Sequence, residues 1–441
     1  MSFSRILIGI ASLALSCSLC AAPAAKSKPT VKTPKVTKTA PKVPAVSQGP
    51  VMIELSHRLD EIQAERMAPM IENFNKQNKD VQVQMVRRAD GAAPKQINLA
   101  TREEYSQFMA RKAKFEPLYQ VMSKAKLSFD SARLAPELRG GVADSRGRLF
   151  ALPLAFSTPV LYINKEAFRK AGLDPDSPPK TWDEAQDMAG KLRASGSQCP
   201  YTTSWPVWTL IDNLSVWNGA PISDAKGKLV FNSLAQVRHV AMMATWHKSK
   251  YFIYFGRGDE ADRRFVAGEC GMFTGSSALF ATLPESGKSN VGVSALPYHS
   301  DAYGAPQHTL ADGASLWVAA GLKPIEIKGV AKFVQYVLGP EVQVNLTLAG
   351  GFLPMTSVAR AAANSKLKKS DLAGLHVAYQ QLKDKAAAPT IRASQVEAVH
   401  RIVDEELEAV WAGHKPAKEA LDHAVERGNA ALKPAVATAK K

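Results

Sequence analysis

The sequence has few cysteines and, beyond its first residues, no long apolar run. Only four of the 441 residues are cysteine, and two of them, Cys17 and Cys20, lie close to the start. A membrane helix needs about 20 consecutive apolar residues, and no later segment provides them. The sequence therefore predicts no membrane-spanning helix after the leader.

Motifs of metal-dependent and nucleophilic enzymes are also missing. After Cys20 there is no CxxC or HExxH spacing, and no GxSxG turn occurs. Residues 287–289 (GKS) resemble the end of a phosphate-binding loop, but Thr282 stands where that loop needs its first glycine. The acids within 404–408 fit the solvated face of a helix better than a catalytic pair. We expect a protein that is not an enzyme and that holds no metal or cofactor.

The first residues have the layout of an export signal. Arg5 precedes an apolar run over 6–15, and small residues follow at Ala21 and Ala22. That run is too short to span a bilayer. The sequence predicts a signal peptide over 1–22. Lipid attachment at Cys17 or Cys20 remains the alternative, although the residues before each cysteine fit such a site poorly.

A basic, low-complexity segment follows the signal. Residues 22–46 are almost only Ala, Lys, Pro, Thr and Val, with six lysines and no acid, in a chain of net charge +16. Such a composition cannot bury enough apolar surface to fold. We expect a disordered linker over 23–50 and a disordered tail over 433–441. The linker either makes a weak electrostatic contact with membrane or envelope polymer, or serves only as a solvated spacer.

Alternating strand and helix patterns begin at Val51. Residues 51–55 have a strand-like sequence, residues 81–86 alternate like a strand, and an apolar stripe over 58–77 predicts a helix between them. Thr181 and Glu184 have the spacing of a capping box that opens another helix. Further expected elements are a strand over 160–163 and helices over 165–171, 329–338 and 394–411. This order predicts an α/β fold in which helices flank parallel sheets.

Export changes how the remaining cysteines are interpreted. Once the leader is removed, only Cys199 and Cys270 remain, in an oxidising compartment. An even pair there favours a disulfide, and two separately buried thiols are the alternative.

Several segments together carry a family resemblance. They are 157–168 (STPVLYINKEAF), 171–175 (AGLDP), 178–182 (PPKTW), 213–219 (NLSVWNG), 313–318 (GASLWV), 402–411 (IVDEELEAVW) and 424–429 (AVERGN). In this order they resemble the extracellular solute-binding proteins of ABC importers, and within them the sn-glycerol-3-phosphate-binding periplasmic subunits. The likeness is strong over 150–430 and weak before it. Cys199 and Cys270 also fall where that family carries cysteines.

The resemblance implies a two-lobed fold with three hinge crossings, near Ser157, Gly313 and Phe352. The first lobe would be 51–157 plus 314–352, and the second 158–313 plus 353–432. It also implies a monomer in the periplasm that closes on a small molecule and presents it to the transmembrane permease subunits, without contact with nucleic acid.

Ligand-binding residues carry over from the family only in part. Ser157 and Ser276 match ligand-contacting serines, and Ser276 is expected to open a helix suited to phosphate, or to be only its N-cap. Gly313 matches a glycine that lets the ligand approach, with a hinge or turn glycine as the alternative. Phe352 replaces a ligand-binding tyrosine, and His400 replaces a phosphate-binding arginine.

The first lobe lacks the family's tyrosine-bearing loop around 87–94. Its ligand glutamate has no secure counterpart, with Glu103 and Glu104 as candidates. Further candidates are Arg401 or Arg392 as substitutes for the lost arginine, and Trp205, Trp208 or Trp217 as walls of the cleft.

Three functions therefore compete. They are import of glycerol-3-phosphate or a glycerophosphodiester, binding of a carbohydrate or polyol by the same fold, and a non-transport envelope sensor or scaffold with a degenerate pocket.

Overall fold

The computed structural model describes residues 49–144, 146–367, 372–382 and 395–432. The expected signal peptide, most of the linker and the expected tail lie outside these ranges, as does Arg392. Within them, no helix combines the length and the apolar character that crossing a membrane requires.

The first sheet has six strands in the order β2-β1-β3-β10-β4, with β5 also paired to β10. Strands β1, β2 and β3 are parallel, and β10 runs antiparallel to β3, β4 and β5. The strands are β1 (Val51–His57), β2 (Val81–Arg87), β3 (Ile97–Ala100), β4 (Phe115–Glu116), β5 (Leu152–Ser157) and β10 (Asp312–Ala319).

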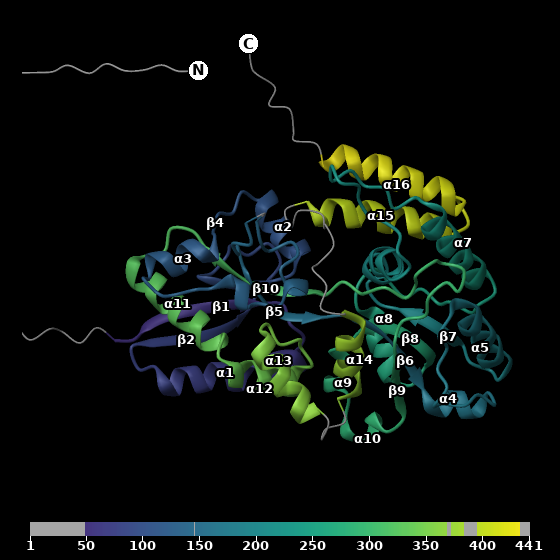
Figure 1. Ribbon diagram of the computed structural model, residues 1–441, viewed down its shortest axis with the longest axis horizontal. Helices are drawn as coiled ribbons and strands as arrows, with labels where there is room; N and C mark the ends of the chain where they lie inside the picture. The colour runs from purple at the N-terminus through teal and green to yellow at the C-terminus, as the bar shows by residue number, and fades with distance from the viewer. Residues whose placement is uncertain (1–48, 145, 368–371, 383–394, 433–441) are drawn as a thin grey trace, which may run out of the picture. The chain divides into compact units, whose positions relative to one another are not determined.

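Helices from two distant parts of the chain accompany this sheet (Figure 1). They are α1 (Glu61–Gln77), α2 (Arg102–Ala110), α3 (Leu118–Lys124), α11 (Pro324–Val337), α12 (Pro340–Gly350) and α13 (Ser357–Leu367), with short 3-10 turns η1 (Ser131–Arg133) and η2 (Pro136–Leu138). Ile53 and Leu55 alternate with outward residues on β1 and are buried, as the period-2 pattern predicts. Phe74 of α1 meets Phe333 of α11 edge to face at 5.1 Å. We call this sheet with its helices the first lobe.

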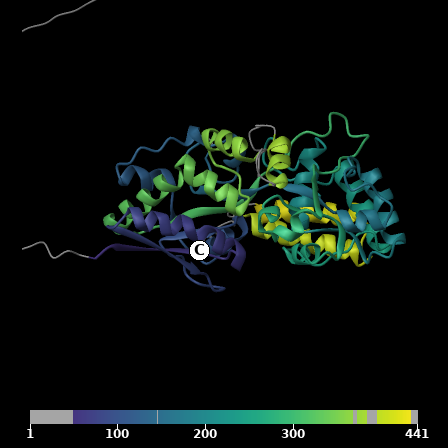
Figure 2. The same cartoon turned by 90° about the horizontal axis from the view of Figure 1, so that it is seen from below.

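The second sheet has four strands in the order β7-β8-β6-β9. They are β6 (Pro159–Asn164), β7 (Cys199–Thr203), β8 (Cys270–Ser276) and β9 (Val291–Ser294). Its helices are α4 (Lys165–Lys170), α5 (Trp182–Ala194), α6 (Leu214–Trp217), α7 (Leu234–Lys248), α8 (Glu260–Val266), α9 (Leu279–Thr282), α10 (Glu285–Lys288), α14 (Ala373–Leu382), α15 (Val396–Trp411) and α16 (Ala417–Leu432), with a π-helical turn η3 (Val207–Asn213). Figure 2 shows the two sheets with separate sets of helices. We call this part the second lobe.

The expected α/β class is confirmed, and local rules explain most element boundaries. Helix α1 begins at Glu61 rather than at 58 because Asp60 caps it, accepting from the Gln63 N–H at 2.7 Å. The predicted capping box is present: Glu184 N–H donates to Thr181 Oγ1, and Thr181 N–H donates to Glu184 Oε2, both at 3.2 Å.

Two later helices also follow their patterns. Helix α11 starts earlier than the expected 329 because Pro324 occupies its first turn, where proline fits best. The apolar stripe of α15, with Val399, Val403 and Leu407 each 1% exposed, is buried in the second lobe.

The predicted disulfide between Cys199 and Cys270 is present. The two cysteines are opposite each other where β7 and β8 pair in parallel, so the bond joins the starts of neighbouring strands. Both are buried, at 3% and 0% exposed.

Candidate functional site

The chain changes sheets between Ser157, the last residue of β5, and Pro159, the first of β6. Strand β8 pairs with β6 so that Ser276 is opposite Pro159. This register brings the two predicted ligand serines together: the Ser276 hydroxyl donates to Ser157 Oγ at 2.7 Å. Sequence reasoning named both residues without showing that they touch.

The expectation that Ser276 opens a helix is wrong. Its hydroxyl accepts from the Ala278 N–H at 3.1 Å, but α9 begins only at Leu279 and is four residues long. Ser276 therefore does not cap α9, and its hydroxyl stabilises the turn that leaves β8.

Strand packing explains why residue 313 is a glycine. It lies on β10 opposite Phe156, beside a β-bulge, with φ +156°. A Cβ at this position would overlap the carbonyl oxygen of Ala155 on β5. The close approach of two backbones explains the glycine without a ligand.

Phe352 is 5% exposed and belongs to the apolar core of the first lobe. It follows Gly351, which ends α12 in the left-handed conformation at φ +73°. Next along the chain, Leu353 N–H donates to the Phe156 carbonyl at 2.8 Å. The aromatic ring that replaces the family's tyrosine thus packs against the end of the first sheet.

His400 lies between two carboxylates from different lobes. Its Nδ1 is 2.9 Å from Glu103 Oε1 on α2, and its Nε2 is 3.6 Å from Asp212 Oδ2 at the end of η3. Burial alone would lower the pKa of His400, but the hydrogen bonds and charges of Asp212 and Glu103 raise it to about 10. The position therefore holds an imidazolium that is already neutralised.

A second ion pair lies at the first residue of β10. Arg102 Nε donates to both carboxylate oxygens of Asp312, at 3.1 and 3.2 Å, and Nη2 donates to Oδ2. Asp312 is opposite Ser157 in the sheet, so this pair is next to the serine pair. Arg102, Asp212 and Asp312 were missed by sequence reasoning, because nothing local marks a residue whose partner is 188 or 210 positions away.

The second lobe adds two acids, Asp262 and Asp404, that form no direct ion pair among the described residues, although the charges of His400 and Arg257 act on Asp404. Burial raises the pKa of Asp262 to about 7, with Ser204 as its hydrogen-bond partner at 2.5 Å. Burial also raises the pKa of Asp404 to about 7. Ser204 is followed by Trp205, which is 44% exposed with φ +50°. The region between the sheets is therefore rich in hydrogen-bond acceptors.

The remaining candidates, Trp217, Trp208 and Arg401, differ in how exposed their side chains are. Trp217 is 3% exposed and donates to the Leu296 carbonyl at 2.9 Å, so it is a core residue, whereas Trp208 is half-buried. The Arg401 side chain is 58% exposed and 4.0 Å from Glu397, one turn earlier on α15. It does not replace the lost arginine beside His400. Among the described residues no group of His, Cys, Asp and Glu has the arrangement of a metal site.

Comparison with known proteins agrees with this architecture. The family model of the bacterial extracellular solute-binding proteins matches residues 69–373. The chain belongs to this family.

A curated relative of this solute-binding protein is the sn-glycerol-3-phosphate-binding periplasmic protein UgpB of Pectobacterium atrosepticum. It is 36% identical over 419 residues, which cover 88% of this chain and 93% of the relative.

Two solved structures share the two-lobed fold. UgpB from Mycobacterium tuberculosis, solved in complex with glycerophosphocholine, has a TM-score of 0.70 at 21% identity and covers 87% of this chain and 98% of its own. The cyclic alpha-maltosyl-1,6-maltose binding protein of Arthrobacter globiformis has a TM-score of 0.68 at 19% identity, with coverages of 87% and 99%.

Proposed function

We propose that this solute-binding protein is the periplasmic receptor of an ABC importer, and that it captures sn-glycerol-3-phosphate or a glycerophosphodiester between its two lobes. The observation that carries the proposal is the contact of Ser157 with Ser276 where the chain passes from one sheet to the other. The two hydroxyls bond to each other where the two sheets meet, and such hydroxyls suit a hydroxylated, phosphorylated ligand. The relatives named for glycerol-3-phosphate support the choice of ligand.

In this proposal the lobes are 51–157 plus 314–352 and 158–313 plus 353–432, except that α13 of the last range packs on α12 and so belongs to the first lobe. The chain works as a monomer without catalysis. Its signal peptide is removed on export, and the transmembrane permease subunits receive the ligand. The basic linker makes at most a weak contact with membrane or envelope polymer. Ser157 and Ser276 are the proposed ligand contacts, whereas Gly313 and Phe352 act through packing beside them and His400 is held by Glu103 and Asp212.

Thermal unfolding with a ligand panel tests this proposal. The full chain is melted with glycerol-3-phosphate, glycerophosphocholine, maltose and glycerol. Mass action stabilises the folded state by about 2.7 kcal/mol when the ligand is at a hundredfold excess over its dissociation constant. We expect a raised Tm with the phosphate esters, and a smaller rise in the Ser157→Ala/Ser276→Ala double variant.

A neutral carbohydrate or polyol is the second candidate, favoured by one feature of the second lobe. Asp262 and Asp404 form no direct ion pair among the described residues, and exposed Trp205 follows Ser204, the hydrogen-bond partner of Asp262. Carboxyls accept hydrogen bonds from sugar hydroxyls, and an aromatic face packs against a sugar ring. A Tm rise with maltose and none with either phosphate ester would replace the leading ligand by this one. An unchanged Tm with every ligand of a broad panel would indicate a scaffold that binds no such ligand.

A further inference from the structure

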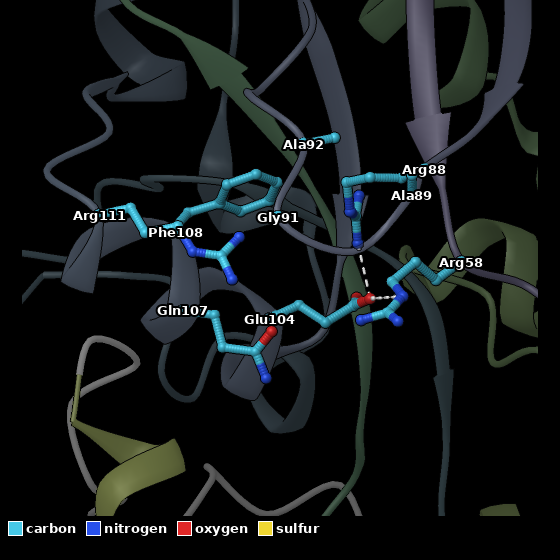
Figure 3. Close-up of a pocket in the computed structure, with 9 residues that line it drawn as sticks. All are labelled: Arg58, Arg88, Ala89, Gly91, Ala92, Glu104, Gln107, Phe108 and Arg111. Carbon is cyan, nitrogen blue, oxygen red and sulfur yellow. Dashed lines mark hydrogen bonds and ion pairs between the residues drawn. The ribbon is translucent and has the colours of Figure 1, made fainter.

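A pocket with three arginines lies in the first lobe, at the carboxyl ends of β1 and β2 (Figure 3). Arg58 follows β1, Arg88 follows β2, and Arg111 follows α2. The pocket contains about 250 Å³ of space not filled by protein atoms. Ligands of α/β folds bind at this end of the strands. We call it the arginine pocket.

Arg88 forms the fixed base of the arginine pocket. It is 9% exposed, and its Nη1 donates to Ser56 Oγ and to the Leu99 carbonyl, both at 3.3 Å. Its Nη2 donates to Glu104 Oε1 at 2.6 Å, and its guanidinium carbon lies 5.1 Å from the centre of the Phe108 ring. These contacts hold the cation in place before any ligand arrives.

The other two arginines of the pocket form fewer hydrogen bonds and ion pairs than Arg88. Arg58 pairs with the exposed Asp90 and lies 3.7 Å from Glu104 Oε1, with 40% of its side chain exposed. The side chain of Arg111 has no hydrogen bond or ion pair with any residue that the structure describes. In Figure 3 its guanidinium points into the space beneath Gly91. A Cβ on Gly91, whose φ is +74°, would lie 3.5 Å from Arg111 Nη1.

The charges of the surrounding residues favour an anion in the arginine pocket over one beside His400. Near His400 an incoming phosphate would meet Glu103, Asp212 and the nearby Asp404, and Arg102 is occupied by Asp312. In the arginine pocket, three guanidinium groups meet two carboxylates, those of Glu104 and of Asp90, which pairs with Arg58, so one positive charge is in excess. Guanidinium groups bind phosphate through paired, charge-assisted hydrogen bonds.

We propose that the arginine pocket is the phosphoryl-binding subsite of this protein. The space of about 250 Å³ includes open solvent, so the arginine pocket suits one compact group of a ligand and not a whole ligand. This assignment rests on the proposed function, in which the phosphoryl group is part of the transported ligand. Free inorganic phosphate is the other source of the same chemistry.

The subsite is joined to the cleft through the first turn of α2. Arg102, Glu103 and Glu104 are consecutive, and they contact Asp312, His400 and Arg88. A phosphoryl group in the arginine pocket competes with Glu104 for Arg58 and Arg88. Its binding therefore acts on the same helical turn that contacts the second lobe.

Isothermal titration of the full chain with inorganic phosphate, glycerol-3-phosphate and glycerol tests the subsite. The variant is Arg111→Gln, because this exposed side chain supports no described contact. Its control is Arg66→Gln, the same change at an exposed position on α1. Gln107→Glu keeps all three arginines and adds a carboxylate to the pocket lining.

Losing one charge-assisted hydrogen bond weakens binding about tenfold to a hundredfold. We expect this loss for both phosphates with Arg111→Gln and with Gln107→Glu, and no change with Arg66→Gln. Unchanged binding in both pocket variants overturns the subsite, and the proposed function then still stands on glycerol-3-phosphate binding. Binding of inorganic phosphate alone, dependent on Arg111, supports the subsite and removes the proposed ligand. No binding of either phosphate by the wild type overturns both.

Discussion

His400 shows how neighbouring carboxylates decide the charge of a side chain. From the sequence alone, a histidine in place of an arginine suggests a loss of positive charge, because an ordinary imidazole is mostly neutral at pH 7. Between Glu103 and Asp212 it stays protonated, with a pKa raised to about 10 from the ordinary 6.5. The same two acids occupy its N–H groups. The position therefore keeps a cation and loses its availability to an anion.

This ion pair makes stability depend on pH. The folded pKa of His400 lies above the unfolded value, so its contribution is complete below about pH 6.5 and declines as the pH rises toward 10. Glu103 remains ionised throughout that window, since its pKa is lowered to about 2. Removing one partner of a buried pair costs about 3–5 kcal/mol. We expect His400→Gln to lose about 3 kcal/mol of unfolding free energy near pH 6, and clearly less near pH 10.

Urea unfolding at both pH values measures this difference, and titration of other groups cancels between wild type and variant. His414→Gln is the control, because His414 is exposed. A deficit of equal size at both pH values would show that His400 is not charged in the folded protein.

At the scale of elements, the disulfide fixes one pair of strands. Strands β7 and β8 are neighbours in the second sheet, yet 71 residues separate Cys199 from Cys270. Between them lie η3, α6, α7 and α8. A bond that closes this long loop restricts the unfolded chain more than a short one would.

We expect the double variant Cys199→Ala/Cys270→Ala to lose about 4 kcal/mol, the loop-entropy value for a separation of 71 residues. Guanidinium unfolding with and without a thiol reductant measures it. The reductant should lower the stability of the wild type to near that of the variant and leave the variant unchanged. A reductant-insensitive wild type would mean that the bond does not form in the purified protein.

At the scale of the whole described chain, one large apolar core is built on the first sheet and two on the second, and one of these two also includes Phe156 of β5. Helices α2 and α15 make a further contact between the lobes. The charged part of that contact is the bond between Glu103 and His400. Within the first lobe, Arg102 beside Glu103 is paired with Asp312 of β10. Polar contacts of this kind can break and re-form as lobes open and close, which an apolar interface resists.

Hydrogen exchange tests the role of this contact. Glu103→Gln removes the charge that holds α2 to α15, so we expect faster deuterium uptake in peptides from these two helices. Peptides from α5, which lies far along the second lobe from this contact, should be unchanged. Glu65→Gln, an exposed carboxylate on α1, is the matched control. Equal uptake in the Glu103 variant and wild type would show that apolar packing alone joins α2 to α15.

The sequence by itself determined the elements whose causes are local. The strand β1, the apolar stripe of α15 and the capping box at Thr181 are set by residues within a few positions, and each was predicted and found. The disulfide was also predictable, because only two cysteines remain after the leader. Family motifs placed Ser157 and Ser276 in one site without geometry.

Only the tertiary structure decided which charges are free to meet a ligand. The partner of Arg102 is 210 residues away, and that of His400 is on another lobe. The arginine pocket unites the ends of two strands with the end of a helix, and no spacing in the sequence marks that convergence. Charge pairing depends on distances between side chains, which a chain acquires only when its sheets and helices have packed.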